Sequence, residues 1–184
     1  STRVGRKMLE YAGRSNLKRV YNELGGKSAF LVFSDFADVK RAAVTVAGSM
    51  FFNQGESCNA PSRVLVQRDI ADDFVKLVTA EAAKYEPGDP LNAGTEMGAI
   101  VDQTQLTTVL GYIEAGRVEG ARLACGGAQA RAETGGCYVQ PTVFDGVTNT
   151  MRIAREEIFG PVMSVLRFDT EDEAVALVRH YLVD

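Results

Sequence analysis

Residues 51–63 read FFNQGESCNAPSR, and they join two segments with different apolar patterns. The segment before them carries apolar side chains at helical spacing, whereas Val64, Leu65 and Val66 directly after them have the composition of a buried strand. Gly55 and Pro61 are residue types that favour turns. The stretch is therefore predicted to be a loop between a helix and a strand.

The same alternation of helical and strand patterns extends outward to both ends of the chain. Apolar runs predict strands at residues 17–24, 29–33, 63–67, 122–125, 138–144 and 162–168. Amphipathic spacing predicts helices at residues 4–15, 39–50, 70–85, 104–118 and 170–182. This order predicts an α/β fold with a largely parallel sheet flanked by helices.

Composition limits the classes of partner. The 184 residues carry a net charge of −4 without a basic block, which argues against a nucleic-acid partner. Their apolar runs are too short for a membrane span. The three cysteines lack CxxC spacing, so we expect neither a disulfide framework nor a metal site, and we expect a cytoplasmic protein.

Cys58 is the candidate nucleophile. A cysteine in a polar loop can be accessible and reactive, although many free cysteines are inert, small apolar residues. A thiolate also needs an activating group. The single histidine, His180, lies in the last predicted helix without an evident partner, which disfavours a Cys–His hydrolase.

Two carboxylates stand at informative places. Glu23 lies at the end of a predicted strand, directly before two glycines, and Glu157 precedes the sequence Ile-Phe-Gly-Pro. Sites in α/β proteins form at the carboxyl ends of strands, so either side chain is a candidate base. The alternative interpretation is that both are solvated turn residues.

Four blocks of sequence together resemble the aldehyde dehydrogenase superfamily. They are STRVG at residues 1–5, ELGGKS at 23–28, FNQGESC at 52–58 and EEIFGPV at 156–162. Their order and spacing also match, and the similarity runs to about residue 178. The resemblance implies that residues 1–184 are a partial catalytic (substrate) domain of the aldehyde dehydrogenase type. Its nucleotide-binding and oligomerisation segments would be largely absent from this chain.

The resemblance also implies roles for individual residues. Cys58 is expected to add to an aldehyde carbon and, after hydride transfer to NAD or NADP, to carry a thioester that Glu23 hydrolyses through water. Its backbone N–H is expected to form part of the oxyanion hole. Glu157 is expected to bind the nicotinamide ribose. The residues expected at the cofactor are Ser1, Val4, Leu24, Glu157 and Phe159.

The whole enzyme is then expected to be a homo-oligomer that oxidises a small-molecule aldehyde to a carboxylic acid, and the 184 residues alone are expected to be inactive. Two alternatives remain. One is a cofactor-free cysteine thioesterase or esterase that uses Cys58 and Glu23. The other is a non-catalytic remnant that serves only as a folded or binding module. The sequence leaves the choice of aldehyde, and of NAD or NADP, open.

Overall fold

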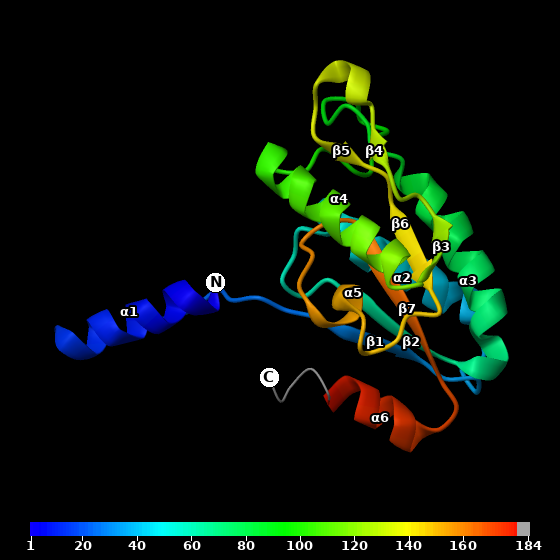
Figure 1. The fold of residues 1–184 in the computed structure, drawn as a ribbon, viewed down its shortest axis with the longest axis horizontal. Helices are drawn as coiled ribbons and strands as arrows, with labels where there is room; N and C mark the ends of the chain where they lie inside the picture. Colours follow the sequence, from blue (N-terminus) through cyan, green and yellow to red (C-terminus); the bar gives the residue numbers. More distant parts are fainter. Residues whose placement is uncertain (180–184) are drawn as a thin grey trace.

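Five strands form the central sheet of the computed structural model, which describes residues 1–179 (Figure 1). In sheet order they are β1 (Ala29–Val32), β2 (Arg63–Gln67), β7 (Val162–Phe168), β6 (Thr142–Asp145) and β3 (Arg122–Cys125). The first four are mutually parallel, and β3 runs antiparallel to β6 at one edge. The predicted α/β fold with a largely parallel sheet is confirmed.

Six α-helices lie within residues 1–179, and all but the first pack on the two faces of this sheet. They are α1 (Thr2–Arg14), α2 (Val39–Phe51), α3 (Arg68–Ala82), α4 (Gln103–Val118), α5 (Arg152–Arg155) and α6 (Glu171–Arg179). Three short 3-10 turns, η1 (Phe52–Gly55), η2 (Ala83–Tyr85) and η3 (Ala132–Thr134), and a hairpin of β4 (Gln129–Ala130) with β5 (Tyr138–Val139), complete the described elements. Asp38 caps α2 by accepting a hydrogen bond from the Arg41 backbone, as its sequence position predicts.

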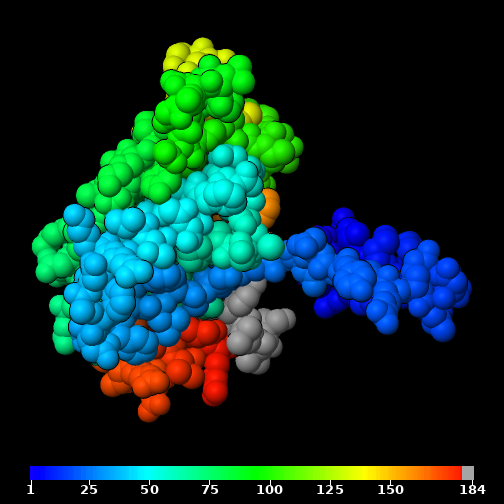
Figure 2. Space-filling view, turned by 180° about the vertical axis from the view of Figure 1, so that it is seen from behind, coloured from blue at the N-terminus to red at the C-terminus, as the bar shows by residue number. Residues whose placement is uncertain are grey.

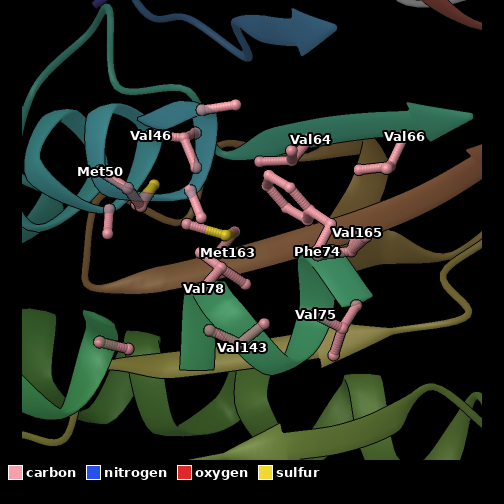
Figure 3. Close-up of a cluster of buried hydrophobic side chains, with 14 of the residues drawn as sticks. Val46, Met50, Val64, Val66, Phe74, Val75, Val78, Val143, Met163 and Val165 are labelled. Carbon is pink, nitrogen blue, oxygen red and sulfur yellow. The ribbon is translucent and has the colours of Figure 1, made fainter. Parts of the chain in front are cut away.

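Two apolar clusters hold the layers together, because side chains alternate across each buried strand. On one face, residues of α2 and α3 pack against Val64 and Val165, with the Phe74 ring over the strands (Figure 3). On the other face, α4 and α5 pack against Leu65 and Leu166. The packing of β2 thereby fixes the position of its first residue, and of the loop before it, at the amino-terminal end of the strand.

Helix α1 lies away from the sheet, at the end of an extended segment formed by residues 15–28 (Figures 1 and 2). Within α1 only Gly5 and Ala12 are buried. A Cβ at Gly5 would lie 2.9 Å from Leu24. The helix therefore packs closely on the part of the extended segment that leads into β1. Residues 1–28 therefore form an arm that leads into β1.

The strand predicted at residues 17–24 is wrong. Leu17 has a φ of 55°, and Leu17 and Tyr21 are 79% and 87% exposed. Although extended, the segment has no neighbouring strand among residues 1–179, and a strand without a ladder partner gains neither hydrogen bonds nor burial. Helix α5 and strand β4 were not predicted, because each is too short to show a period.

The last predicted helix is confirmed as α6 up to Arg179, and His180 lies outside the described residues. Among the helices of residues 1–179, none combines the length and apolar composition needed to cross a bilayer.

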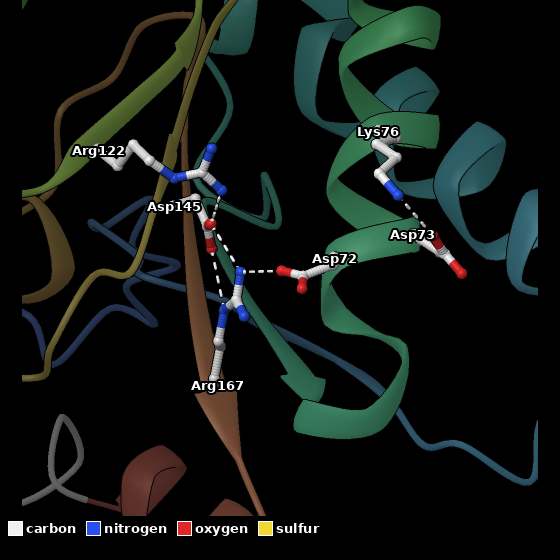
Figure 4. A network of polar contacts seen from close by, with 6 residues as sticks. All are labelled: Asp72, Asp73, Lys76, Arg122, Asp145 and Arg167. Carbon is white, nitrogen blue, oxygen red and sulfur yellow. Dashed lines mark hydrogen bonds and ion pairs between the residues drawn. The ribbon is translucent and has the colours of Figure 1, made fainter.

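Asp145 joins the edge of the sheet to a helix (Figure 4). Its buried carboxylate accepts hydrogen bonds from Arg167 on β7, at 2.8 Å, and from Arg122 on β3, and Arg167 also bonds Asp72 on α3 at 2.8 Å. Burial alone would raise the pKa of Asp145, but the bonds from Arg167 and Arg122 bring it below its ordinary value of 3.8. The network therefore needs an ionised Asp145.

Replacing Asp145 by Asn should lower the free energy of unfolding by about 2 kcal/mol at pH 7, because Arg122 and Arg167 lose the buried carboxylate that they share, while Arg167 keeps the exposed Asp72. Urea denaturation measures this. The exposed pair of Asp73 and Lys76, also drawn in Figure 4, provides a control, and Asp73→Asn should cost less than about 1 kcal/mol. Equal losses in both variants would contradict the structural role of the network.

The same variant has a defined pH dependence. A carboxylate with a depressed folded-state pKa contributes fully above its unfolded value, and the contribution disappears as the pH falls through the folded value. The stabilities of the wild-type protein and Asp145→Asn should therefore differ above pH 3.8 and converge below it.

Candidate active site

Cys58 lies exposed in the loop between η1 and β2, as predicted. The chain reaches it through a left-handed turn, in which Asn53, Gln54 and Gly55 have φ values of 48°, 58° and 70°. Non-glycine residues rarely adopt this conformation, which costs about 1 to 3 kcal/mol for each one. Contacts with the rest of the protein must therefore maintain the turn.

Those contacts come from two distant segments. The side-chain oxygen of Gln54 accepts a hydrogen bond from the Gly98 backbone at 3.2 Å, and Glu56 accepts one from the Val101 backbone at 3.2 Å. The backbone of Gly55 lies so close to the Gly160 carbonyl that an added Cβ would be 2.4 Å from its oxygen. The loop before α4 and the segment before β7 thus hold the turn that presents Cys58.

The two glycines at 25 and 26 connect Cys58 to Glu157. A Cβ on Gly26 would lie 1.9 Å from the Cys58 carbonyl oxygen, so the two backbones touch. The Gly26 N–H donates a hydrogen bond to Oε1 of Glu157 at 3.0 Å, and a Cβ on Gly25 would be 2.5 Å from Oε2. Three blocks far apart in the sequence therefore meet here. A cavity of about 310 Å³ adjoins the first two of these blocks, with Gly25, Gly26, Lys27, Cys58 and Asn59 in its lining.

Glu23 is exposed beside the N-terminus. Its carbonyl oxygen accepts a hydrogen bond from the Ser1 backbone nitrogen at 3.3 Å, and the Ser1 hydroxyl accepts one from Val4 at the start of α1. Leu24 packs on Gly5 of the same helix. The structure thus places Glu23 and Leu24 beside the start of α1, where Ser1 and Val4 lie. Within residues 1–179 the Glu23 carboxylate has no hydrogen-bond partner, and none joins it to Cys58.

Phe159 follows Glu157 on a strained backbone. Its φ is 54°, and its side chain is 39% exposed although it is large and apolar. The amide of Gln105 on α4 donates to the carbonyl oxygens of Ile158 and Phe159, at 2.9 and 2.8 Å. These bonds fix the conformation that leaves the ring at the surface.

Sequence reasoning missed Lys27. Its side chain is 2% exposed, and its Nζ has no hydrogen-bond partner in the described part of the chain. Its pKa falls from 10.5 to about 7, mainly because burial disfavours the charged amine and secondarily because the positive charge of Arg63 repels it, while Glu157 and Glu156 oppose the change. The only signal in the sequence is a lysine directly after two glycines that need close packing.

The other two cysteines differ from Cys58. Cys125 and Cys137 are partly buried, and burial raises the pKa of the Cys125 thiol, which lowers its thiolate fraction. No group of three acidic, histidine or cysteine side chains suited to a metal ion occurs in residues 1–179. Cys58 is thus the most accessible thiol in a loop that other segments hold in place.

Comparison with known proteins gives consistent results. The model of the aldehyde dehydrogenase family matches residues 1–180. The chain is 48% identical over 175 residues to mouse cytosolic aldehyde dehydrogenase 1, and 49% identical to human mitochondrial aldehyde dehydrogenase. These alignments cover 95% of the chain but 34% and 33% of the relatives, so the chain spans about a third of their length.

Solved structures agree with this assignment. A γ-glutamyl-γ-aminobutyraldehyde dehydrogenase from Burkholderia cenocepacia superposes with a TM-score of 0.92 at 56% identity. An indole-3-acetaldehyde dehydrogenase in complex with NAD+ superposes with a TM-score of 0.93 at 52% identity. Each match covers 97% of this chain and 36% of the solved chain.

Replacing Gly55 by Ala should both destabilise the protein and lower the alkylation rate of Cys58, because the methyl group meets the Gly160 carbonyl. Gly120→Ala is the matched control, since Gly120 also has a positive φ, of 90°, but has open space around it. The control should cost about 1 kcal/mol, and Gly55→Ala clearly more. Equal costs, or unchanged alkylation, would show that the close approach does not position Cys58.

Replacing Lys27 by Met should stabilise the protein most at low pH. Below about pH 7 Lys27 is charged in both the folded and unfolded states, so the wild-type protein bears the full cost of burying the charge. Between pH 7 and 10.5 only the unfolded state keeps the proton, so wild-type stability rises by up to about 1.4 kcal/mol for each pH unit. The advantage of the Met variant in urea denaturation should therefore shrink from pH 6 to pH 9, and a constant advantage would contradict a buried, titrating lysine.

Proposed function

Because this chain belongs to the aldehyde dehydrogenase family, we propose that the full protein oxidises an aldehyde to a carboxylic acid with NAD+ or NADP+ as the oxidant. The chain forms the bulk of the catalytic domain, and the nucleotide-binding and oligomerisation segments lie largely outside it. The observation that carries the proposal is that the Gly25–Gly26 turn packs against the Cys58 loop beside a cavity and is hydrogen-bonded to Glu157.

Cys58 is the nucleophile in this proposal. Its thiolate adds to the aldehyde carbon and forms a tetrahedral thiohemiacetal, whose oxygen carries negative charge. The backbone N–H of Cys58, held by the left-handed turn before it, donates to that oxygen. Loss of hydride from the same carbon leaves a thioester on the sulfur.

Glu23 is the general base that resolves the thioester. Its carboxylate is exposed and has no hydrogen-bond partner in residues 1–179, so it is available to take a proton from water. The Gly25–Gly26 turn that follows it packs against the Cys58 backbone, which supports its assignment to the same site. Water then attacks the acyl carbon, and the thiolate leaves.

The described residues fit a dinucleotide. Oε2 of Glu157 has no partner within residues 1–179 and can accept from a ribose hydroxyl, and the exposed Phe159 ring offers an apolar surface to a planar base. The N-terminus of α1 at Ser1 and Val4, with Leu24 beside it, suits a phosphate group. When bound there, the oxidised nicotinamide supplies a hydride acceptor.

The names of relatives support a substrate class. They include an indole-3-acetaldehyde dehydrogenase with NAD+, a complex with NAD+ and octanal, and a γ-glutamyl-γ-aminobutyraldehyde dehydrogenase. We therefore infer NAD+ as the cofactor and aliphatic or arylalkyl aldehydes as substrates. We also propose a homo-oligomer, which the resemblance to the family implies, and a cytoplasmic location, since the relatives include a cytosolic enzyme.

Rapid mixing of the full protein with aldehyde and NAD+ tests the two chemical roles. Cys58→Ala should abolish NADH formation, whereas Glu23→Gln should keep a first burst of NADH and lose about 10²- to 10⁴-fold in steady-state turnover, because only hydrolysis needs the base. Absorbance at 340 nm reads both phases.

Cys125→Ala is the matched control and should retain both phases of NADH formation. Ester hydrolysis that depends on Cys58, without NADH under any condition, would replace the proposal by a cofactor-free thioesterase. A wild-type protein in which Cys58 reacts no faster than Cys125 would favour a non-catalytic module.

A further inference from the structure

Lys27 ranks among the largest fully buried side chains, and its amine has no hydrogen-bond partner in residues 1–179. An unpaired amine in the interior is costly, and Met would fill the same volume without that cost. Packing alone therefore does not account for a lysine at this position. An effect of its charge on neighbouring groups accounts for it.

Three charged side chains face Lys27 from the elements around it. Arg63, on β2, repels the amine, whereas Glu157 and Glu156, in the segment between α5 and β7, attract it. The Arg63 guanidinium donates to the carbonyl oxygens of Lys27 and Leu177, at 3.2 Å each, which fixes its place. Within residues 1–179, the charges that attract the lysine are therefore those of the two acids.

The carboxylates of Glu156 and Glu157 differ in the number of hydrogen bonds that they accept. The Glu156 carboxylate is committed to Arg152, at 3.0 and 3.2 Å, and to the Tyr112 hydroxyl at 2.8 Å. Glu157 accepts a single hydrogen bond, from the Gly26 N–H, and its other oxygen has no partner within residues 1–179. An attraction from Lys27 therefore has its largest effect on the position of Glu157.

We propose that Lys27 is a positioning residue whose ammonium group holds the Glu157 carboxylate on the Gly25–Gly26 turn, so that the second carboxylate oxygen is ready for a ribose hydroxyl. The ligand in this inference rests on the proposed function. The backbone supplies the geometry, since Gly26 bonds Glu157 and Lys27 is the next residue. The burial of Lys27 reduces the screening of this attraction by solvent.

The attraction between Lys27 and Glu157 depends on pH. Because burial and Arg63 bring the pKa of Lys27 to about 7, against the opposing effect of Glu157 and Glu156, the amine loses its proton near neutrality. As the pH rises through this range the attraction disappears, and Glu157 is held by the Gly26 N–H alone.

The first test needs no ligand. Amide hydrogen exchange of Gly26, compared at one pH near 6, reports its bond to Glu157. Lys27→Met should speed this exchange severalfold even though it raises global stability, whereas Lys27→Arg, which keeps the charge, should not. A purely structural role would move local protection and global stability in the same direction. Unchanged Gly26 exchange in Lys27→Met would overturn the proposal.

The second test measures NAD+ affinity of the full protein by calorimetry between pH 6 and 9. Wild-type affinity should fall about fivefold to tenfold, the size expected for weakening one hydrogen bond to a charged group. Lys27→Met should bind NAD+ from pH 6 to pH 9 with the low affinity that the wild-type protein has at pH 9. Glu157→Gln should remove the pH dependence of NAD+ affinity. Lys84→Met, at an exposed lysine, is the control and should match the wild-type protein.

The outcomes separate the two proposals. If the wild-type protein binds NAD+ and Lys27→Met binds equally well with the same pH profile, the role of Lys27 is overturned and the proposed function stands. If no variant binds NAD+ at any pH, the proposed function fails, and the exchange of the Gly26 amide alone decides whether Lys27 holds Glu157.

Discussion

The backbone of Gly26 lies against the carbonyl oxygen of Cys58, and the arrangement of the whole site depends on this close approach. A side chain at Gly26 would overlap that oxygen, at 1.9 Å, and one at Gly25 would overlap Glu157, at 2.5 Å. Without side chains, the two glycines let the segment that leaves the N-terminal arm pass between the Cys58 loop and Glu157. They bring three parts of the chain within hydrogen-bond distance of one another at almost no cost in volume.

The Cys58 loop shows how distant segments maintain a costly conformation. Asn53 and Gln54 adopt left-handed backbone angles that the local sequence does not favour. Bonds from the backbones of Gly98 and Val101, and close contact with Gly160, compensate for that cost. The position of the thiol is thus set by the loop before α4 and by the segment before β7, not by the loop itself.

Asp145 and Lys27 are both buried charged side chains, but their surroundings stabilise the charge to different degrees. Asp145 is surrounded by Arg167 and Arg122, and the network joins β3, β6, β7 and α3 into one rigid edge. Lys27 has no hydrogen-bond partner for its amine within residues 1–179, and the acids that attract it, Glu156 and Glu157, are hydrogen-bonded to other groups. A paired charge stabilises a fold only modestly, but an unpaired one is sensitive to pH, which suits a residue that adjusts a neighbouring side chain.

The sequence by itself determined the alternation of helices and strands, the loop position of Cys58 and the family, because apolar periodicity and short motifs are local properties. It did not determine that residues 17–24 lack a strand partner, that Lys27 is buried, or that the backbone before Cys58 is left-handed. Those features depend on neighbours more than twenty residues away, such as Glu157 for Gly26 and Gly98 for Gln54. Only the tertiary structure decides them, since burial and hydrogen-bond partners are set by the whole packed chain rather than by any one segment.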